Sequence, residues 1–130
     1  METSRDKPDV LMEKAGEDQY LLELAAPDGR VSDSLLGFHA QQAVEKALKA
    51  VLARNHVGFA RVHNIVYLLA LLNEARIAQP PNPDVLKRLT PFAVDYRYGE
   101  LLTDSPEPLD RSLTIEVVRR VLDWAAPLIR

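Results

Sequence analysis

The chain contains no cysteine, only 5 glycines in 130 residues, and few aromatic side chains, which make up 6% of the sequence. The absence of cysteine excludes disulfide bonds, thiol chemistry and any zinc site built on cysteine. Because glycine is scarce and no segment alternates strictly between apolar and polar residues, β-hairpins are not expected. No run approaches the roughly 20 apolar residues of a membrane-spanning helix. These absences leave a helical protein as the expected fold class.

The composition and charge are those of one globular domain. Hydrophobic residues make up 47% of the chain and the formal net charge is −3. A chain of this length normally forms one domain with its own core, so residues 1–130 are predicted to be a single unit. The negative net charge makes RNA an unexpected partner. Residues 1–7 carry mixed charges and no apolar run, so we expect a cytoplasmic protein without a secretory signal or a membrane partner.

Apolar residues recur at helical spacing in five segments, which predicts an all-α fold, a five-helix up-and-down antiparallel bundle. The first helix is expected to begin within residues 6–8 and to end at about residue 25. The others are expected at 32–55, 65–72, 83–98 with a kink or a short break at Pro91, and 110–128. Candidate N-caps stand at the start of four of them: Ser32 or Asp33, Asn64, Asn82 and Asp110. On the last helix, the side chains expected to face the core are those of Leu113, Val117, Val121, Trp124 and Leu128.

The second helix, from Ser32 to Arg54, is apolar over roughly two-thirds of its circumference when it is placed on a helical wheel. A surface helix normally buries a stripe only a little wider than about 100°. We therefore expect this helix to lie at the centre of the bundle. Part of its apolar surface is expected to contact a second copy of the chain, which predicts a homodimer.

A narrow polar stripe remains on this helix. Side chains three or four residues apart lie above one another on it, namely His39, Gln42, Lys46 and Lys49. Glu45 lies at the edge of the stripe, and Gln41 falls inside the apolar arc, where its amide needs partners. A solvated helix face with a Glu45–Lys49 ion pair would explain the same pattern.

Three features, in this order along the chain, resemble the HEPN-domain proteins of prokaryotes. They are the run Phe38–Ala50 (Phe-His-Ala-Gln-Gln-Ala-Val-Glu-Lys-Ala-Leu-Lys-Ala), His63 at the start of the third helix, and Asp95–Tyr98 (Asp-Tyr-Arg-Tyr). The resemblance implies an all-α up-and-down bundle that is often a homodimer. It also implies a frequent genetic neighbour, a minimal nucleotidyltransferase, in a toxin–antitoxin-like context. Some members of the family are ribonuclease toxins.

The ribonuclease motif of that family is an arginine followed four to six residues later by a histidine. Arg97 stands where the arginine would be, but no histidine follows it, since His39, His56 and His63 all precede it. Metal-independent RNA cleavage needs a group that moves a proton near neutral pH, which arginine cannot do. We therefore assign no catalytic residues. An alternative is a ribonuclease whose histidine comes from elsewhere in the fold or from a second subunit.

The preferred interpretation is a non-catalytic module that binds a nucleotide or a similar anionic ligand, pairs with a minimal nucleotidyltransferase as the resemblance implies, or does both. Its predicted ligand-binding residues are His39, Gln42, Glu45, Lys46, Lys49, His63, Asp95, Arg97 and Tyr98. Lysine and arginine suit a phosphate, and tyrosine can stack on a base. A third possibility is a purely structural dimeric interaction subunit that holds a nucleotidyltransferase. Against a ligand, Glu45 and Asp95 could neutralise the cations internally in a salt-bridge network. No cofactor or metal site is expected, because the three histidines lack ligand spacing.

Overall fold

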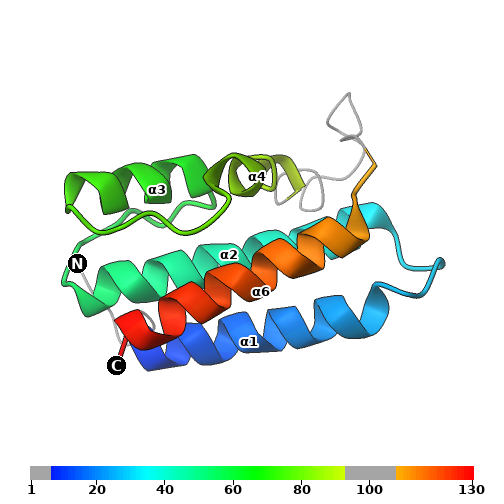
Figure 1. Cartoon of the computed structure of the whole chain (residues 1–130), viewed down its shortest axis with the longest axis horizontal. Helices are drawn as coiled ribbons and strands as arrows, with labels where there is room; N and C mark the ends of the chain where they lie inside the picture. Colours follow the sequence, from blue (N-terminus) through cyan, green and yellow to red (C-terminus); the bar gives the residue numbers. More distant parts are fainter. Residues whose placement is uncertain (1–6, 93–107) are drawn as a thin grey trace.

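The computed structural model describes residues 7–92 and 108–130, and the chain is all-helical there (Figure 1). Its helices are α1 (Pro8–Ala25), α2 (Asp33–Arg54), α3 (Ile65–Glu74), α4 (Pro83–Lys87) and α6 (Arg111–Leu128). The long helices α1, α2 and α6 lie side by side, and α3 and α4 form a second row beside α2. The predicted all-α class is confirmed, and the first three helices lie where the sequence placed them.

The directions of the long helices follow from contacts at their ends. Arg111, at the start of α6, hydrogen-bonds to Asp33 at the start of α2. At the other end, Arg54 donates to the carbonyl of Arg130 over 3.2 Å. Helix α6 therefore runs in the same direction as α2 and antiparallel to α1. The intervening α3 and α4 return the chain to the start of α2, which allows this parallel pair.

The helix starts are set by short polar side chains, as the sequence predicted for three of them. Ser32 accepts from the backbone N–H of Leu35 over 3.1 Å. Asn64 and Asp110 accept in the same way, over 3.2 and 3.0 Å, from the third residue after each. Asn82 differs, because its backbone is left-handed (φ 56°) and its side chain makes no cap hydrogen bond. Asparagine tolerates that conformation better than most residues.

The fourth helix is interrupted three residues before Pro91, where a kink or a short break was expected. Its first part ends at Lys87, and after a turn at residues 88–89 the residues 90–92 are again helical. The predicted continuation to Tyr98 lies outside the described residues. Phe92 packs directly on α2 at Gly37, where a Cβ atom would lie 2.2 Å from Cδ1 of the ring. Glycine is therefore required at Gly37 to seat this turn.

Helix α6 buries a broader face than the sequence indicated. Val117 and Val121 are buried as expected, but Leu113 and Leu128 are 38% and 40% exposed. The additional buried positions are Thr114, Val118, Leu122 and Ala125. The reason is that α6 lies against both α1 and α2, so its buried face is wide in the middle of the helix and ends before its terminal leucines.

Helix α2 is covered by other parts of its own chain. Its apolar positions are almost all fully buried, between α1, α6 and α3. The wide apolar arc thus reflects a central place within one chain, although Leu35 and Phe38 near the start of α2 are only partly buried. A homodimer through the central helices stays a prediction. Separately, none of the helices in the described ranges is long and apolar enough to cross a membrane.

Arg111 joins the start of α6 to the connection between α1 and α2. Its Nε donates to Oδ1 of Asp33 over 3.0 Å. Its Nη1 donates to the carbonyls of Ala26 and Asp28, over 2.8 and 3.1 Å, and Nη2 donates to that of Val31 over 2.6 Å. These carbonyls end α1 or belong to the turn after it. The Arg111 guanidinium therefore donates hydrogen bonds to the backbone carbonyls of this turn, which positions α1 against α2.

We predict that Arg111→Ala lowers the free energy of unfolding by about 2–4 kcal/mol, because it removes several charge-assisted hydrogen bonds and leaves partly buried carbonyls without partners. Urea denaturation monitored by circular dichroism measures the change. Arg120→Ala is the matched control on the same helix, because Arg120 is half-exposed and pairs with Glu116. Such a surface pair contributes about 0–1 kcal/mol. Equal losses in the two variants would contradict the role of Arg111.

Candidate functional site

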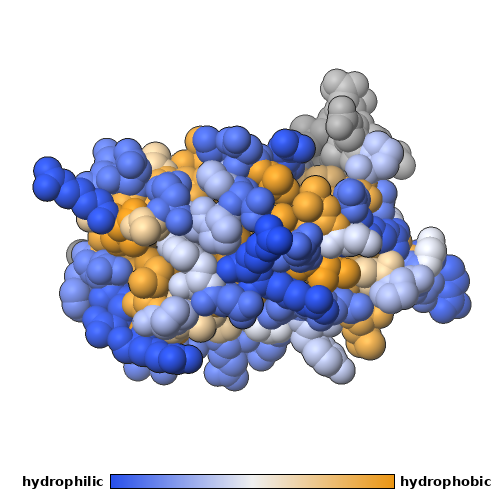
Figure 2. All heavy atoms as spheres, in the orientation of Figure 1, coloured by the Kyte–Doolittle hydropathy of each residue, from blue (hydrophilic) through white to orange (hydrophobic). Residues whose placement is uncertain are grey.

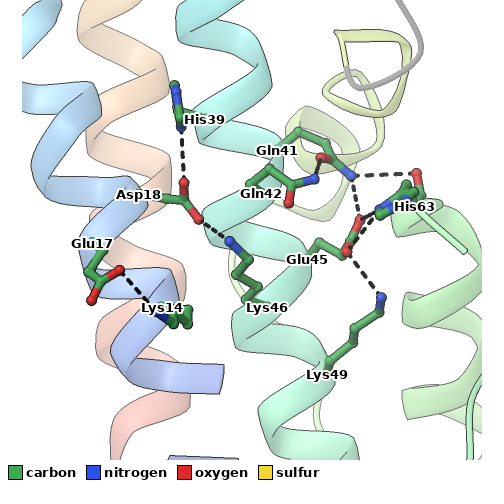
Figure 3. Close-up of polar contacts among 10 residues, drawn as sticks. All are labelled: Lys14, Glu17, Asp18, His39, Gln41, Gln42, Glu45, Lys46, Lys49 and His63. Carbon is green, nitrogen blue, oxygen red and sulfur yellow. Dashed lines mark hydrogen bonds and ion pairs between the residues drawn. The ribbon is translucent and has the colours of Figure 1, made fainter. Parts of the chain in front are cut away.

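The polar stripe of α2 is divided between two clusters, each organised by one carboxylate (Figure 3). The first, called here the Asp18 cluster, consists of Asp18, His39 and Lys46. Asp18 reaches α2 from α1. Its Oδ1 lies 3.0 Å from Nδ1 of His39, and its Oδ2 accepts from Nζ of Lys46 over 2.5 Å. This carboxylate therefore ties two stripe residues to the neighbouring helix.

The second, called here the Glu45 cluster, consists of Glu45, Gln41, Lys49 and His63. Oε1 of Glu45 accepts from Nε2 of Gln41 and lies close to Nδ1 of His63, both over 2.9 Å. Oε2 accepts from Nζ of Lys49 over 3.0 Å. Figure 3 shows that this cluster joins α2 to the residues that lead into α3, on the opposite side of the stripe from Asp18.

The two glutamines complete the Glu45 cluster. Gln42 donates from Nε2 to Oε1 of Gln41 over 2.8 Å, and Gln41 also donates to the carbonyl of His63 over 3.4 Å. Gln41 is fully buried, so the expectation that its amide needs partners is confirmed. No buried side-chain nitrogen or oxygen lacks a hydrogen-bond partner in the ranges 7–92 and 108–130.

Burial makes the charge pairs of the Glu45 cluster strong. The side chains of Glu45 and Lys49 are 4% and 12% exposed, whereas those of Asp18 and Lys46 are 12% and 27% exposed. In surroundings of low dielectric constant, each charge requires its partner. The two lysines face two carboxylates, so the described part of the stripe has no excess of positive charge while His39 and His63 are neutral.

The connection between α2 and α3 covers the Glu45 cluster. The ammonium of Lys49 lies 5.6 Å from the centre of the Phe59 ring, a cation–π contact. The hydroxyl of Tyr67 accepts from the backbone N–H of Ala60 over 2.9 Å. The Phe59 and His63 contacts attach the connection to α2, and the hydrogen bond between Ala60 and Tyr67 attaches it to α3.

The structure therefore places six of the nine predicted site residues on or beside one stripe. His39 and Lys46 belong to the Asp18 cluster, Glu45, Lys49 and His63 belong to the Glu45 cluster, and Gln42 bonds to Gln41. The other three, Asp95, Arg97 and Tyr98, lie outside the described residues. The cleft that all nine were predicted to form is thus seen only in part, and its ligand stays a prediction.

Asp18 is the site residue that the sequence interpretation missed. It is a carboxylate within the apolar repeat of the first helix, which also contains Ala15 and Leu22. An acid at such a position points toward the core side of its helix, where it requires a cationic partner. That pattern was the available signal, and Lys46 was the available partner.

The chemistry of these clusters is that of ion pairs. Each histidine lies with Nδ1 against a carboxylate, an arrangement that orients an imidazole. In the described residues there is no group of three histidine, aspartate or glutamate side chains that could hold a metal ion. The geometry therefore explains the polar stripe: its side chains fix α1 and the α2–α3 connection on α2.

A separate apolar hollow of about 460 Å³ lies between α4 and the first turns of α6. Figure 2 shows hydrophobic atoms at the surface there. Its apolar lining includes Val85, Leu89, Phe92, Leu109 and Leu113. Phe92 and Pro108, both in its wall, are the last described residues before and the first after the range 93–107. None of the six predicted site residues on or beside the stripe lines this hollow.

The fold and the site define a small helical domain whose central helix carries an internally paired polar stripe. The profile of the HEPN domain matches residues 9–128. The chain therefore belongs to the HEPN-domain family, as the resemblance of its motifs implied. Among solved structures, it is similar to ST0689, described as an archaeal HEPN homologue, with a TM-score of 0.63 and 23% identity over 95% of this chain and 98% of that one. No curated protein matches the sequence.

We predict that Glu45→Gln lowers the free energy of unfolding by about 3–5 kcal/mol, because it leaves the Lys49 ammonium buried without a counter-charge. The double variant Glu45→Gln/Lys49→Met should recover part of the loss, since neither charge remains. Chemical denaturation of both single variants and the double variant gives the coupling energy.

Glu116→Gln is the control for this cycle. Glu116 pairs with Arg120 on α6, and both side chains are about half-exposed. Its loss should stay below about 1 kcal/mol. If the effects at Glu45 and Lys49 were simply additive, the two side chains would not form the coupled pair that the geometry indicates.

Proposed function

We propose that this chain is a non-catalytic HEPN module that acts by binding a partner protein, the class implied by the family resemblance being a minimal nucleotidyltransferase. The observation that carries the proposal is the internal pairing of the α2 stripe. Its lysines and histidines contact Asp18 and Glu45, which come from the same chain. These residues stabilise the module, and binding is left to its outer surfaces.

The ribonuclease alternative is disfavoured by two observations. Arg97 is not followed by any histidine in the sequence. His39 and His63, the two histidines beside the stripe, each have Nδ1 against a carboxylate, and both carboxylates also hold a lysine. The lysines beside these histidines are paired with the same two carboxylates, so a phosphate would have to compete with Asp18 or Glu45 for them.

The anionic-ligand alternative rests on the same lysines. A phosphate would have to compete with Asp18 for Lys46, or with the buried Glu45 for Lys49. Displacing a carboxylate from a buried pair leaves an uncompensated charge, which is strongly unfavourable. Lys46 is the more accessible of the two, with 27% of its side chain exposed, so a nucleotide site would have to be centred there.

We predict that the purified chain does not cleave RNA above background. Incubation with mixed RNA in the presence of a chelator, followed by gel electrophoresis, measures this. Arg97→Ala serves as the control for a contaminating nuclease, since contamination gives the same background in both samples. Cleavage that is present in the wild type and lost in Arg97→Ala would establish the ribonuclease alternative.

We predict that the chain co-purifies with a minimal nucleotidyltransferase encoded beside its own gene, when the two are co-expressed and only one carries an affinity tag. The variant Lys46→Met should co-purify equally well, because Lys46 acts within its own chain. A co-expressed nucleotidyltransferase from an unrelated gene pair is the control for non-specific retention.

Two results would contradict this proposal. One is the absence of any complex with the neighbouring nucleotidyltransferase. The other is a saturable rise in melting temperature with ATP or sulfate that Lys46→Met abolishes, which would assign the stripe to an anionic ligand instead.

A further inference from the structure

Exposed apolar side chains are concentrated on α1. Tyr20 and Leu24 are 70% and 65% exposed, the two highest values among the large hydrophobic side chains of the described ranges. Single exposed hydrophobic side chains are normal on a protein surface, but a group of them is informative. Of the seven such side chains that are exposed in the described part of the chain, four lie on this helix: Val10, Tyr20, Leu21 and Leu24.

Three of these side chains form one patch. Leu24 comes four residues after Tyr20 and three after Leu21, so the three adjoin on one side of the helix. The residues of α1 that are buried, Ala15 and Leu22, lie on the opposite side. Figure 2 shows hydrophobic atoms near the C-terminal end of α1, on a surface that is otherwise largely hydrophilic there. The second half of α1 therefore carries an apolar patch that no described segment covers.

Acidic side chains continue the same row toward the start of α1. Glu17 lies three residues before Tyr20 and four before Leu21, and Glu13 lies four residues before Glu17. Both carboxylates belong to exposed residues. The lysine beside them, Lys14, lies 3.6 Å from Glu17, and more than half of each of these two side chains is exposed. Such an exposed pair contributes little, so both carboxylates are available to another molecule.

Two further carboxylates add to this negative charge. Asp9 lies in the first turn of α1, and Asp123, on α6, lines a shallow hollow together with Tyr20. The cation at this hollow, Arg119, is already held by Glu23, whose carboxylate oxygens accept from it over 2.9 and 2.8 Å. These hydrogen bonds lower the pKa of Glu23, so the pair remains ionised and neutral as a whole. The outer side of α1 is therefore acidic as well as apolar.

The sign of this charge decides which class of molecule the apolar patch fits. RNA and anionic lipid headgroups would be repelled by the carboxylates. A second copy of the chain would bring the same negative charge to a two-fold contact at this surface, where like charges are unfavourable. A protein segment that carries lysine or arginine beside apolar side chains matches both halves of the row.

We propose that this surface, called here the α1 strip (Glu13, Glu17, Tyr20, Leu21 and Leu24), binds a basic amphipathic segment of the partner protein. The inference rests on the proposed function, and it states which surface of the module the partner contacts. Tyr20 and Leu24 bury their apolar surface against that segment, and tyrosine is enriched at the centres of interfaces. Glu13 and Glu17 pair with its cations, which steers the two proteins together.

The first test is the affinity for the nucleotidyltransferase encoded beside the gene, measured by isothermal titration calorimetry with purified proteins. The double variant Tyr20→Ala/Leu24→Ala should bind at least about tenfold more weakly than the wild type. Val66→Ala, at an exposed site on α3, is the matched control and should bind like the wild type. Because all of these side chains are exposed, the urea midpoints should stay near that of the wild type.

The second test is the charge of the α1 strip. Glu13→Lys/Glu17→Lys should slow association by about tenfold at low ionic strength, and added sodium chloride should reduce this difference, because salt screens exposed charges. Surface plasmon resonance measures both rates. Glu74→Lys/Asp84→Lys is the matched control, because it makes the same change in net charge at two exposed carboxylates of α3 and α4. It should associate at close to the wild-type rate.

Cross-linking identifies the segment that is bound, because the chain has no cysteine of its own and a single label can be placed. A benzophenone group attached at Glu17→Cys should cross-link to a nucleotidyltransferase peptide that contains lysine or arginine among apolar residues. The same group attached at Val66→Cys should not cross-link to that peptide. Mass spectrometry of the digested products identifies the peptide.

The outcomes separate this inference from the proposed function. A wild-type complex that forms equally well with both α1 strip variants would overturn the inference and leave the proposed function standing. An acidic peptide, or a second copy of the chain, cross-linked at Glu17→Cys would do the same. Absence of any complex with the wild type would overturn both.

Discussion

The buried carboxylate of Glu45 is the constraint on which the rest of the structure depends. Helix α2 can be the central helix only if its lysines do not require water, and Glu45 meets that condition for Lys49 over 3.0 Å. Asp18 does the same for Lys46 from the neighbouring helix. Each carboxylate also contacts a histidine. The contacts that neutralise the buried charges therefore also position the neighbouring segments on α2.

The local features of the fold were predictable because their causes are local. Ser32, Asn64 and Asp110 cap helices with side chains that reach only three residues along the chain. The apolar repeat of α2 predicted its central position in the bundle, since an apolar face that wide must be covered on several sides. The same repeat did not reveal what covers it. Among the described residues α1, α3 and α6 cover it, and the expected contact with a second copy stays a prediction.

The remaining features depend on residues far apart in sequence, so periodicity could not identify them. Arg111 bonds to the turn after α1 across about 80 residues, mainly through backbone carbonyls that have no sequence signature. The Glu45–Lys49 pair that the sequence offered is present over 3.0 Å. The pairing of His39 and Lys46 with Asp18 was not identified. Whether Lys46 faces a ligand or a carboxylate depends on the orientation of α1, which sets the position of Asp18.

The same pairing bears on where function can reside in this fold. A side chain that neutralises a buried charge is not free to bind a ligand without destabilising the fold, so the stripe of α2 is constrained by stability. The opposite holds on α1, where Gly16, Tyr20 and Leu24 contribute little to the core and leave apolar surface in water. By this reasoning the part of the family motif that lies on α2, with its paired lysines, maintains the scaffold.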